Sequence, residues 1–369
     1  MKKIFLLLIA IVTSNFIFCQ CNGRYETEIF NSVSKITVNY SDEYNDNEHK
    51  MDVYTADGDT ETNRPIILYM HGGSFYGGDK ASADCVDFCE SMAKRGYVTA
   101  SLNYRLANII SFITSNETQY ETVLKAVADV KSAVRYFRKD FANSDTYSID
   151  PTTIFVSGYS AGAVTAIHLA YIDSISDLPT SPINVQSIVT DVGGQQYGLE
   201  GDAGNYGYPS NVSGVISFAG GINDVNWIDA SDEPLVSIQG DEDLTVNYYC
   251  GPGMNTPSIL TLCGAGEMHP QADEVGLIND KLIFSGEGHD WGAYGNNNPK
   301  FIQAVDFTAD FLFPLLPCNN TTNITEAAKG SKKLVKVLDL LGRKSTIGAN
   351  NTLFYLYSDG SVERKFICK

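Results

Sequence analysis

Hydrophobic and polar residues alternate along two early segments of the chain and then give way to continuous apolar runs. The alternation over residues 34–40 and 50–55 predicts two antiparallel strands, each half-buried. Residues 65–71 form an almost unbroken apolar run, which is typical of a strand buried on both faces of a sheet. Further strands are predicted at 97–102, 154–157, 212–218, 235–239 and 281–284.

Helices are marked by a different spacing. Between residues 118 and 139, apolar side chains recur every three or four positions and so share one helix face: Val123, Val127, Val130, Val134 and Phe137. Helices are also predicted at 81–94, 161–171 and 299–312. Because strands and helices alternate, the sequence predicts an α/β fold whose mostly parallel sheet is flanked by helices.

The end of the chain has a different pattern. Residues 317–331 are rich in Asn, Thr, Gly and Ser, which indicates a linker, and two β-like stretches follow at 334–340 and 352–368. We therefore expect a main domain over 21–316 and a small β-module over 332–369.

The main domain and the β-module also differ in charge. The chain of 369 residues has a formal net charge of −18, which disfavours nucleic-acid binding because phosphate backbones are repelled. Residues 329–369 are basic, with nine Lys and Arg against three acidic residues. The 43% of hydrophobic residues is enough for a full core and excludes wholesale disorder.

The first twenty residues indicate export. Lys2 and Lys3 precede the apolar run from Ile4 to Val12, which is typical of a signal peptide over 1–20. The run is shorter than the ~20 residues of a membrane-spanning helix. An uncleaved anchor is the alternative, because the expected small residues at the cleavage site are poorly matched. The expected location is therefore extracellular or the cell surface.

Eight cysteines fit an oxidising compartment. Cys250 and Cys263 bracket a loop rich in Gly and Pro and are the favoured disulfide pair. Cys85 and Cys89 either pair with Cys21 or Cys318, or stay buried. No Cys or His spacing supports zinc, and no metal site is predicted.

The strongest chemical motif is Gly158-Tyr159-Ser160-Ala161-Gly162. This G-x-S-x-G pattern lies between a predicted buried strand and a predicted helix, where a sharp turn exposes the serine hydroxyl as a nucleophile. The alternative is a glycine-rich turn without chemistry.

A serine nucleophile needs a base and an acid that orients the base. In this type of site the acid and then the histidine follow the serine along the chain, which leaves His269 and His289 as bases. His289 is favoured because it follows the strand at 281–284, whereas His269 is expected in an irregular loop. The acid belongs to the cluster Asp241-Glu242-Asp243, whose members the residues alone do not separate.

An oxyanion needs backbone donors. The amide of Ala161 follows the nucleophile directly, and the amides of Gly73 and Ser74 lie in the loop 71–75, after a buried strand. We expect His71 to brace this loop, because it precedes the nucleophile.

These motifs resemble the α/β-hydrolase fold, in particular carboxylesterases with an HGG-type oxyanion loop, among them hormone-sensitive-lipase-like and bacterial feruloyl-esterase-like enzymes. The likeness covers about residues 60–315. Relatives carry the acid in a G-x-x-D-x-x-V pattern, matched by Gly240, Asp243 and Val246, so the resemblance selects Asp243. It also selects His289 through G-x-G-H, and it implies no cofactor. Ser74 replaces a glycine of many lipases, and residues 173–211 match no known cap.

The tail has a resemblance of its own. Residues 336–342 and 354–360 look like type IX secretion C-terminal sorting domains, which implies contact with an export machinery. The alternative is an ordinary β-rich accessory domain.

Together these features predict a secreted serine esterase in which Ser160, His289 and Asp243 form the catalytic triad. Phe75, Tyr159 and Trp291 are candidates for the substrate pocket. Acetyl or feruloyl esters on polysaccharide, or a polyester, are the expected substrates. The alternatives are a prolyl-oligopeptidase-like peptidase, although those usually carry a large N-terminal propeller, and a non-catalytic binding protein on a hydrolase scaffold.

Overall fold

The computed structural model describes residues 21, 23–317, 334–338, 351–357 and 362–367. The predicted signal peptide and all but one residue of the predicted linker lie outside these residues. The chain divides into two compact units, Met1–Asn320 and Thr321–Lys369.

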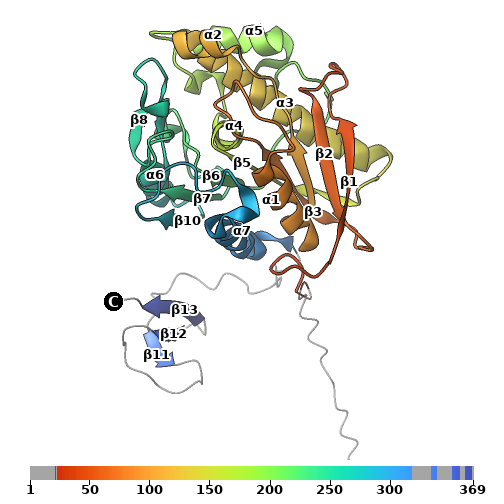
Figure 1. Ribbon diagram of the computed structural model, residues 1–369, viewed down its shortest axis with the longest axis vertical. Coiled ribbons are helices and arrows are strands. Elements are labelled where there is room, and N and C mark those ends of the chain that lie inside the picture. Colours follow the sequence, from red (N-terminus) through yellow and green to blue (C-terminus); the bar gives the residue numbers. More distant parts are fainter. Residues whose placement is uncertain (1–20, 22, 318–333, 339–350, 358–361, 368–369) are drawn as a thin grey trace, which may run out of the picture. The chain divides into compact units, whose positions relative to one another are not determined.

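The first unit is built on a sheet of eight strands in the order β1-β2-β4-β3-β5-β6-β7-β10 (Figure 1). The pairs β1–β2 and β2–β4 are antiparallel, and the other five pairs are parallel. The sheet is therefore mostly parallel, as predicted. Its strands are β1 (Val33–Asn39), β2 (Lys50–Ala56), β3 (Arg64–Met70), β4 (Val98–Leu102), β5 (Ile149–Tyr159), β6 (Val215–Phe218), β7 (Leu235–Gly240) and β10 (Asn279–Phe284).

Helices cover both faces of this sheet, as the alternating pattern predicts. Apolar residues of α3 (Asn116–Asn143), α4 (Ala161–Tyr171) and α6 (Ala265–Val275) belong to one core cluster. Apolar residues of α1 (Ala83–Lys94) and α7 (Pro299–Leu312) belong to the other. Every residue of β3 is buried, which explains its continuous apolar sequence.

Several elements have no counterpart in the predicted pattern. They are α2 (Ile109–Thr114), α5 (Val185–Tyr197) and the hairpin of β8 (Cys250–Pro252) and β9 (Thr261–Cys263). The prediction of an irregular loop around His269 was wrong, because this residue lies in α6. Gly264, Gly266 and Pro270 read as loop residues, but burial of Met268 and Ala272 in the core overrides that local preference.

The disulfide prediction is confirmed for Cys250 and Cys263, which pair across the hairpin. Cys85 and Cys89 are buried free thiols on α1. Cys21 is disulfide-bonded.

In the second unit, the described residues form one antiparallel sheet in the order β11-β12-β13. Its strands are β11 (Leu334–Leu338), β12 (Asn351–Tyr357) and β13 (Val362–Ile367). The predicted stretch 352–368 is thus two strands. Among the described residues of both units, none of the helices combines the length and apolar character needed to cross a membrane.

Candidate active site

Ser160 lies in a sharp turn between β5 and α4. Its φ of 54° is in the left-handed region, which is uncommon for residues other than glycine. Its N–H donates to the carbonyl of Phe218 at 2.8 Å, and its carbonyl accepts from the N–H of Val164 at 2.9 Å. Strand β6 and helix α4 therefore hold the backbone of this turn from both sides.

The two glycines of the motif are required by close backbone contacts. A Cβ at Gly158 would lie 2.4 Å from the carbonyl carbon of Gly162. A Cβ at Gly162 would lie 2.1 Å from the carbonyl oxygen of Met70, at the end of β3. No side chain fits at either position without moving the helix away from the sheet.

The structure brings Ser160, His289 and Asp243 together, although they are far apart in the sequence. His289 Nε2 lies 2.8 Å from Ser160 Oγ, and His289 Nδ1 lies 2.7 Å from Asp243 Oδ2. The three residues follow the carboxyl ends of β5, β10 and β7, which meet at one edge of the sheet. Ser160 and Asp243 are buried, and the His289 side chain is 11% exposed.

Asp243 differs from its acidic neighbours in its contacts. Its Oδ1 accepts hydrogen bonds from the amides of Thr245 at 2.8 Å and Val246 at 3.0 Å, which leaves Oδ2 directed at His289. Asp241 is exposed and accepts from the amide of Gly286 at 2.6 Å. Within this cluster the contact with His289 is therefore made by Asp243.

The loop after β3 passes directly beside the nucleophile. A Cβ at Gly72 would lie 3.3 Å from Ser160 Cβ. The next three residues, Gly73, Ser74 and Phe75, all have positive φ. The Gly73 carbonyl accepts hydrogen bonds from the amides of Tyr76 at 3.2 Å and Gly77 at 3.1 Å. Consecutive residues of this kind direct their N–H groups into a concave, anion-binding surface. Among the described hydrogen bonds of turns and loops, the amides of Gly73, Ser74 and Ala161 are not donors.

His71 is buried beneath this loop. Its Nδ1 lies 2.6 Å from the carbonyl of Gly72, and its ring stacks on Tyr104 with the ring centroids 4.4 Å apart. The Tyr104 hydroxyl donates to the His71 carbonyl at 2.7 Å. Burial lowers the pKa of His71, which favours an uncharged ring that supports the loop.

His269 is held far from this chemistry. Its Nδ1 lies 2.6 Å from Asn279 Oδ1, and burial lowers its pKa to about 4. The Nε2 of the same ring is buried without a hydrogen-bond partner among the described residues. The ring is therefore uncharged at neutral pH and packed into the fold.

A small apolar cavity of about 60 Å³ opens beside Ser160 Oγ. It is lined by Ser74, Phe75, Phe112, Ser160, Ala161, Val164, Thr245, Val246, Gly253, Met254, Ile259 and Leu262. Phe75 is thus a lining residue. The sequence pattern did not indicate Phe112 or the hairpin residues as lining residues, and only the cysteine pair marked the segment that forms the hairpin.

Tyr159 and Trp291, the other two pocket candidates, lie outside this cavity. The Tyr159 hydroxyl donates to the carbonyl of His289, so this side chain supports the loop that carries the base. Trp291 is buried against Phe218 and Phe284, with ring centroids 5.6 and 5.1 Å away.

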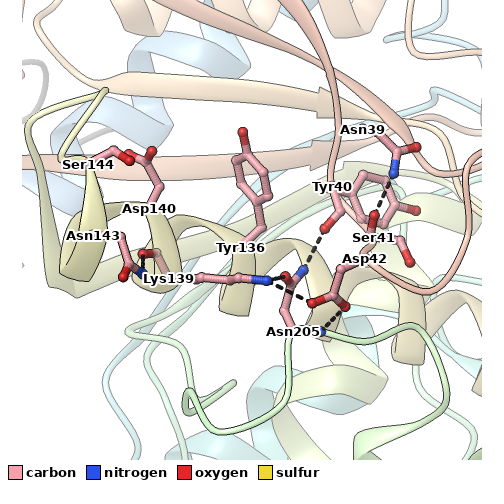
Figure 2. Close-up of a pocket in the computed structure, with 10 residues that line it drawn as sticks. All are labelled: Asn39, Tyr40, Ser41, Asp42, Tyr136, Lys139, Asp140, Asn143, Ser144 and Asn205. Carbon is pink, nitrogen blue, oxygen red and sulfur yellow. Dashed lines mark hydrogen bonds and ion pairs between the residues drawn. The ribbon is translucent and has the colours of Figure 1, made fainter.

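A larger and more polar hollow of about 380 Å³ lies between β1, α3 and the segment around Asn205 (Figure 2). Lys139 Nζ donates to Asp42 at 2.7 Å and to Asn205 at 3.1 Å, and the Asp140 carboxylate accepts from Thr146. The residues that line it include no histidine or cysteine, so the nucleophilic chemistry belongs to the cavity at Ser160.

The fold and this arrangement of side chains define an α/β-hydrolase. Within that class, residues 51–255 match the BD-FAE family, and the chain belongs to this family. The matched region includes the loop at 72–75, the turn at Ser160 and Asp243, and it ends before His289.

Comparison with individual proteins gives three further findings. Juvenile hormone esterase of Heliothis virescens is 30% identical over 106 residues, which are 29% of this chain and 17% of that protein. This chain therefore covers about a sixth of that esterase. A truncated carbohydrate esterase from gut microbiota superposes with a TM-score of 0.53 at 19% identity, over 78% of this chain and 97% of its own. Apo Thermogutta terrifontis esterase 2 has a TM-score of 0.53 at 19% identity, over 76% and 94% of the two chains. Both structures share the fold of this protein.

Proposed function

We propose that the protein is a carboxylic ester hydrolase that acts through an acyl-enzyme on Ser160. The observation that carries this proposal is the hydrogen-bonded series of Ser160, His289 and Asp243 at the turn between β5 and α4. Membership of the BD-FAE family and the esterase fold of the structural neighbours support it.

In the proposed reaction, Ser160 Oγ attacks the ester carbonyl while His289 Nε2 accepts the hydroxyl proton. Asp243 holds the Nδ1–H tautomer and stabilises the imidazolium. The amides of Gly73, Ser74 and Ala161 donate to the oxyanion, and one such donor typically lowers the barrier by ~2.7–4 kcal/mol. His289 then gives the proton to the leaving alcohol. Water next attacks the acyl carbonyl while His289 accepts its proton, and the acid is released as the bond to Ser160 Oγ breaks and His289 returns that proton to Oγ.

We further propose a secreted enzyme whose tail contacts an export machinery and whose substrates are esters on polysaccharide, acetyl esters among them. The basic β-module and the amino-terminal sequence support export, and the carbohydrate esterase neighbour supports a carbohydrate-linked substrate.

The test uses the full chain with p-nitrophenyl acetate and p-nitrophenyl butyrate, beside Ser160→Ala. The matched control is Ser157→Ala, which removes a buried hydroxyl from β5, the strand that leads into the turn. We expect Ser160→Ala to lose at least about 10³-fold in kcat, since loss of a triad nucleophile removes the covalent route. Activity that survives in Ser160→Ala would overturn the proposal. Fluorophosphonate labelling of folded wild type, with no ester turnover, would indicate a different bond, such as a peptide amide.

A further inference from the structure

The far wall of the cavity at Ser160 comes from two elements that have no counterpart in the predicted pattern. Helix α2 contributes Phe112, and the β8–β9 hairpin contributes Met254, Ile259 and Leu262. Phe112 and Ile259 are buried, whereas Met254 is half-buried. These apolar side chains line one side of the cavity.

Both elements are fixed to helix α3 by one buried side chain, Gln119. Its Nε2 donates to the carbonyls of Phe112 at 2.7 Å and Ser258 at 3.0 Å. Its Oε1 accepts from the amide of Leu260 at 2.9 Å. The disulfide between Cys250 and Cys263 closes the hairpin at its base. The wall is therefore held at a defined distance from the nucleophile.

The position of the base determines which half of an ester enters this cavity. His289 lies within hydrogen-bond distance of Ser160 Oγ but does not line the cavity. A general acid must reach the leaving oxygen, so the alcohol has to lie on the His289 side. The cavity then receives the acyl group.

The size of the cavity limits that acyl group. The cavity of about 60 Å³ is several times smaller than pockets that take drug-sized ligands, which measure roughly 300–1,000 Å³. A feruloyl group, with an aromatic ring and a methoxy substituent, exceeds this space. Acyl chains of two to four carbons fit.

Met254 is placed where it can limit the length of the acyl group. Its amide donates to the carbonyl of Thr245 at 2.7 Å, and the Tyr76 hydroxyl contacts its sulfur at 4.0 Å. These contacts hold Met254 between the loop that follows Asp243 and the loop that follows β3. We infer that the enzyme is selective for short acyl groups and that Met254 determines the maximum acyl length. This inference rests on the proposed esterase function.

The experiment compares kcat/KM for p-nitrophenyl acetate, butyrate and octanoate in wild type and Met254→Ala. The matched control is Thr261→Ala, an exposed side chain on the same hairpin. One methylene that a pocket accepts or rejects changes kcat/KM by roughly 10–200-fold, so we expect wild type to favour butyrate over octanoate by at least about 100-fold. Met254→Ala should raise the octanoate-to-butyrate ratio at least about tenfold, and Thr261→Ala should leave it unchanged.

Equal use of octanoate and butyrate by wild type would overturn the inference, as would an unchanged ratio in folded Met254→Ala. Leu262→Ala, which enlarges the same wall from β9, replaces it if Met254→Ala does not fold. The proposed esterase function fails separately, if wild type hydrolyses none of the three esters or if Ser160→Ala hydrolyses them equally well.

Discussion

Replacing Asp243 by asparagine tests how the base is held. Asp243 Oδ1 accepts two backbone N–H groups, from Thr245 and Val246, and Oδ2 faces His289 Nδ1. In Asp243→Asn the amide oxygen must take the Oδ1 position. The opposite orientation would leave two buried N–H groups unpaired, at about 1–3 kcal/mol each. The new NH₂ group then faces His289 Nδ1.

This orientation reverses the imidazole tautomer. Nδ1 has to accept a hydrogen bond, so the proton moves to Nε2, which then donates toward Ser160 Oγ and no longer accepts its proton. The same exchange in serine proteases lowers kcat by about 10⁴-fold, which corresponds to about 5 kcal/mol in the barrier. We expect a loss of this size in Asp243→Asn, with little change in the free energy of unfolding.

The assay is the steady-state hydrolysis of p-nitrophenyl butyrate, with Asp241→Asn as the matched control. Asp241 lies two residues away and is exposed, and its carboxylate contacts the amide of Gly286 rather than a histidine. We expect Asp241→Asn to keep kcat within about twofold of wild type, since it does not contact the base. An equal loss in both variants, or an Asp243→Asn variant within tenfold of wild type, would refute this account of the acid.

Two further predictions concern stability. Gly162→Ala places a Cβ 2.1 Å from the Met70 carbonyl, so we expect the free energy of unfolding in urea to fall by about 1–3 kcal/mol or more, and an unchanged midpoint would contradict this close contact. His269 has a pKa of about 4 when folded, below its ordinary value of 6.5, so the unfolded chain binds more protons between these pH values and stability falls as the pH falls. Lowering the pH from 7 to 5 should therefore cost about 2 kcal/mol through this group. In urea titrations at both pH values, the free energy of unfolding of His269→Gln should fall by about 2 kcal/mol less than that of wild type. Equal losses in the two proteins would refute this role of His269.

The parts of the site that the sequence predicts are those with strict local requirements. A strand, a tight turn and a helix surround Ser160, and the flanking glycines are readable because only glycine fits against the neighbouring backbone. The acid was harder to identify from the residues alone, because Asp241 and Asp243 both follow the end of β7. Their difference arises from the turn after β7, in which the amides of Thr245 and Val246 fix one carboxylate and not the other.

The cavity wall was not predictable for a different reason. The contacts that position α2 and the hairpin run through Gln119, whose partner Ser258 lies 139 residues further along the chain. Local patterns carry no information about such a contact. Trp291 shows the reverse: its place in the sequence next to His289 suggested a pocket residue, but its ring packs into the core with Phe218 and Phe284.

The disulfide that closes the hairpin has a consequence for how the substrate range of such an enzyme evolves. The Cys250–Cys263 bond fixes the spacing between the two ends of this segment, whatever residues lie between them. Insertions at the exposed positions of the loop are then absorbed at the surface, where they cost little, whereas replacements at Met254, Ile259 or Leu262 reshape the cavity wall. Asp243 and His289 lie outside the closed segment and keep their positions on the sheet. Selection can therefore alter which esters are accepted while the groups that break the bond stay in place.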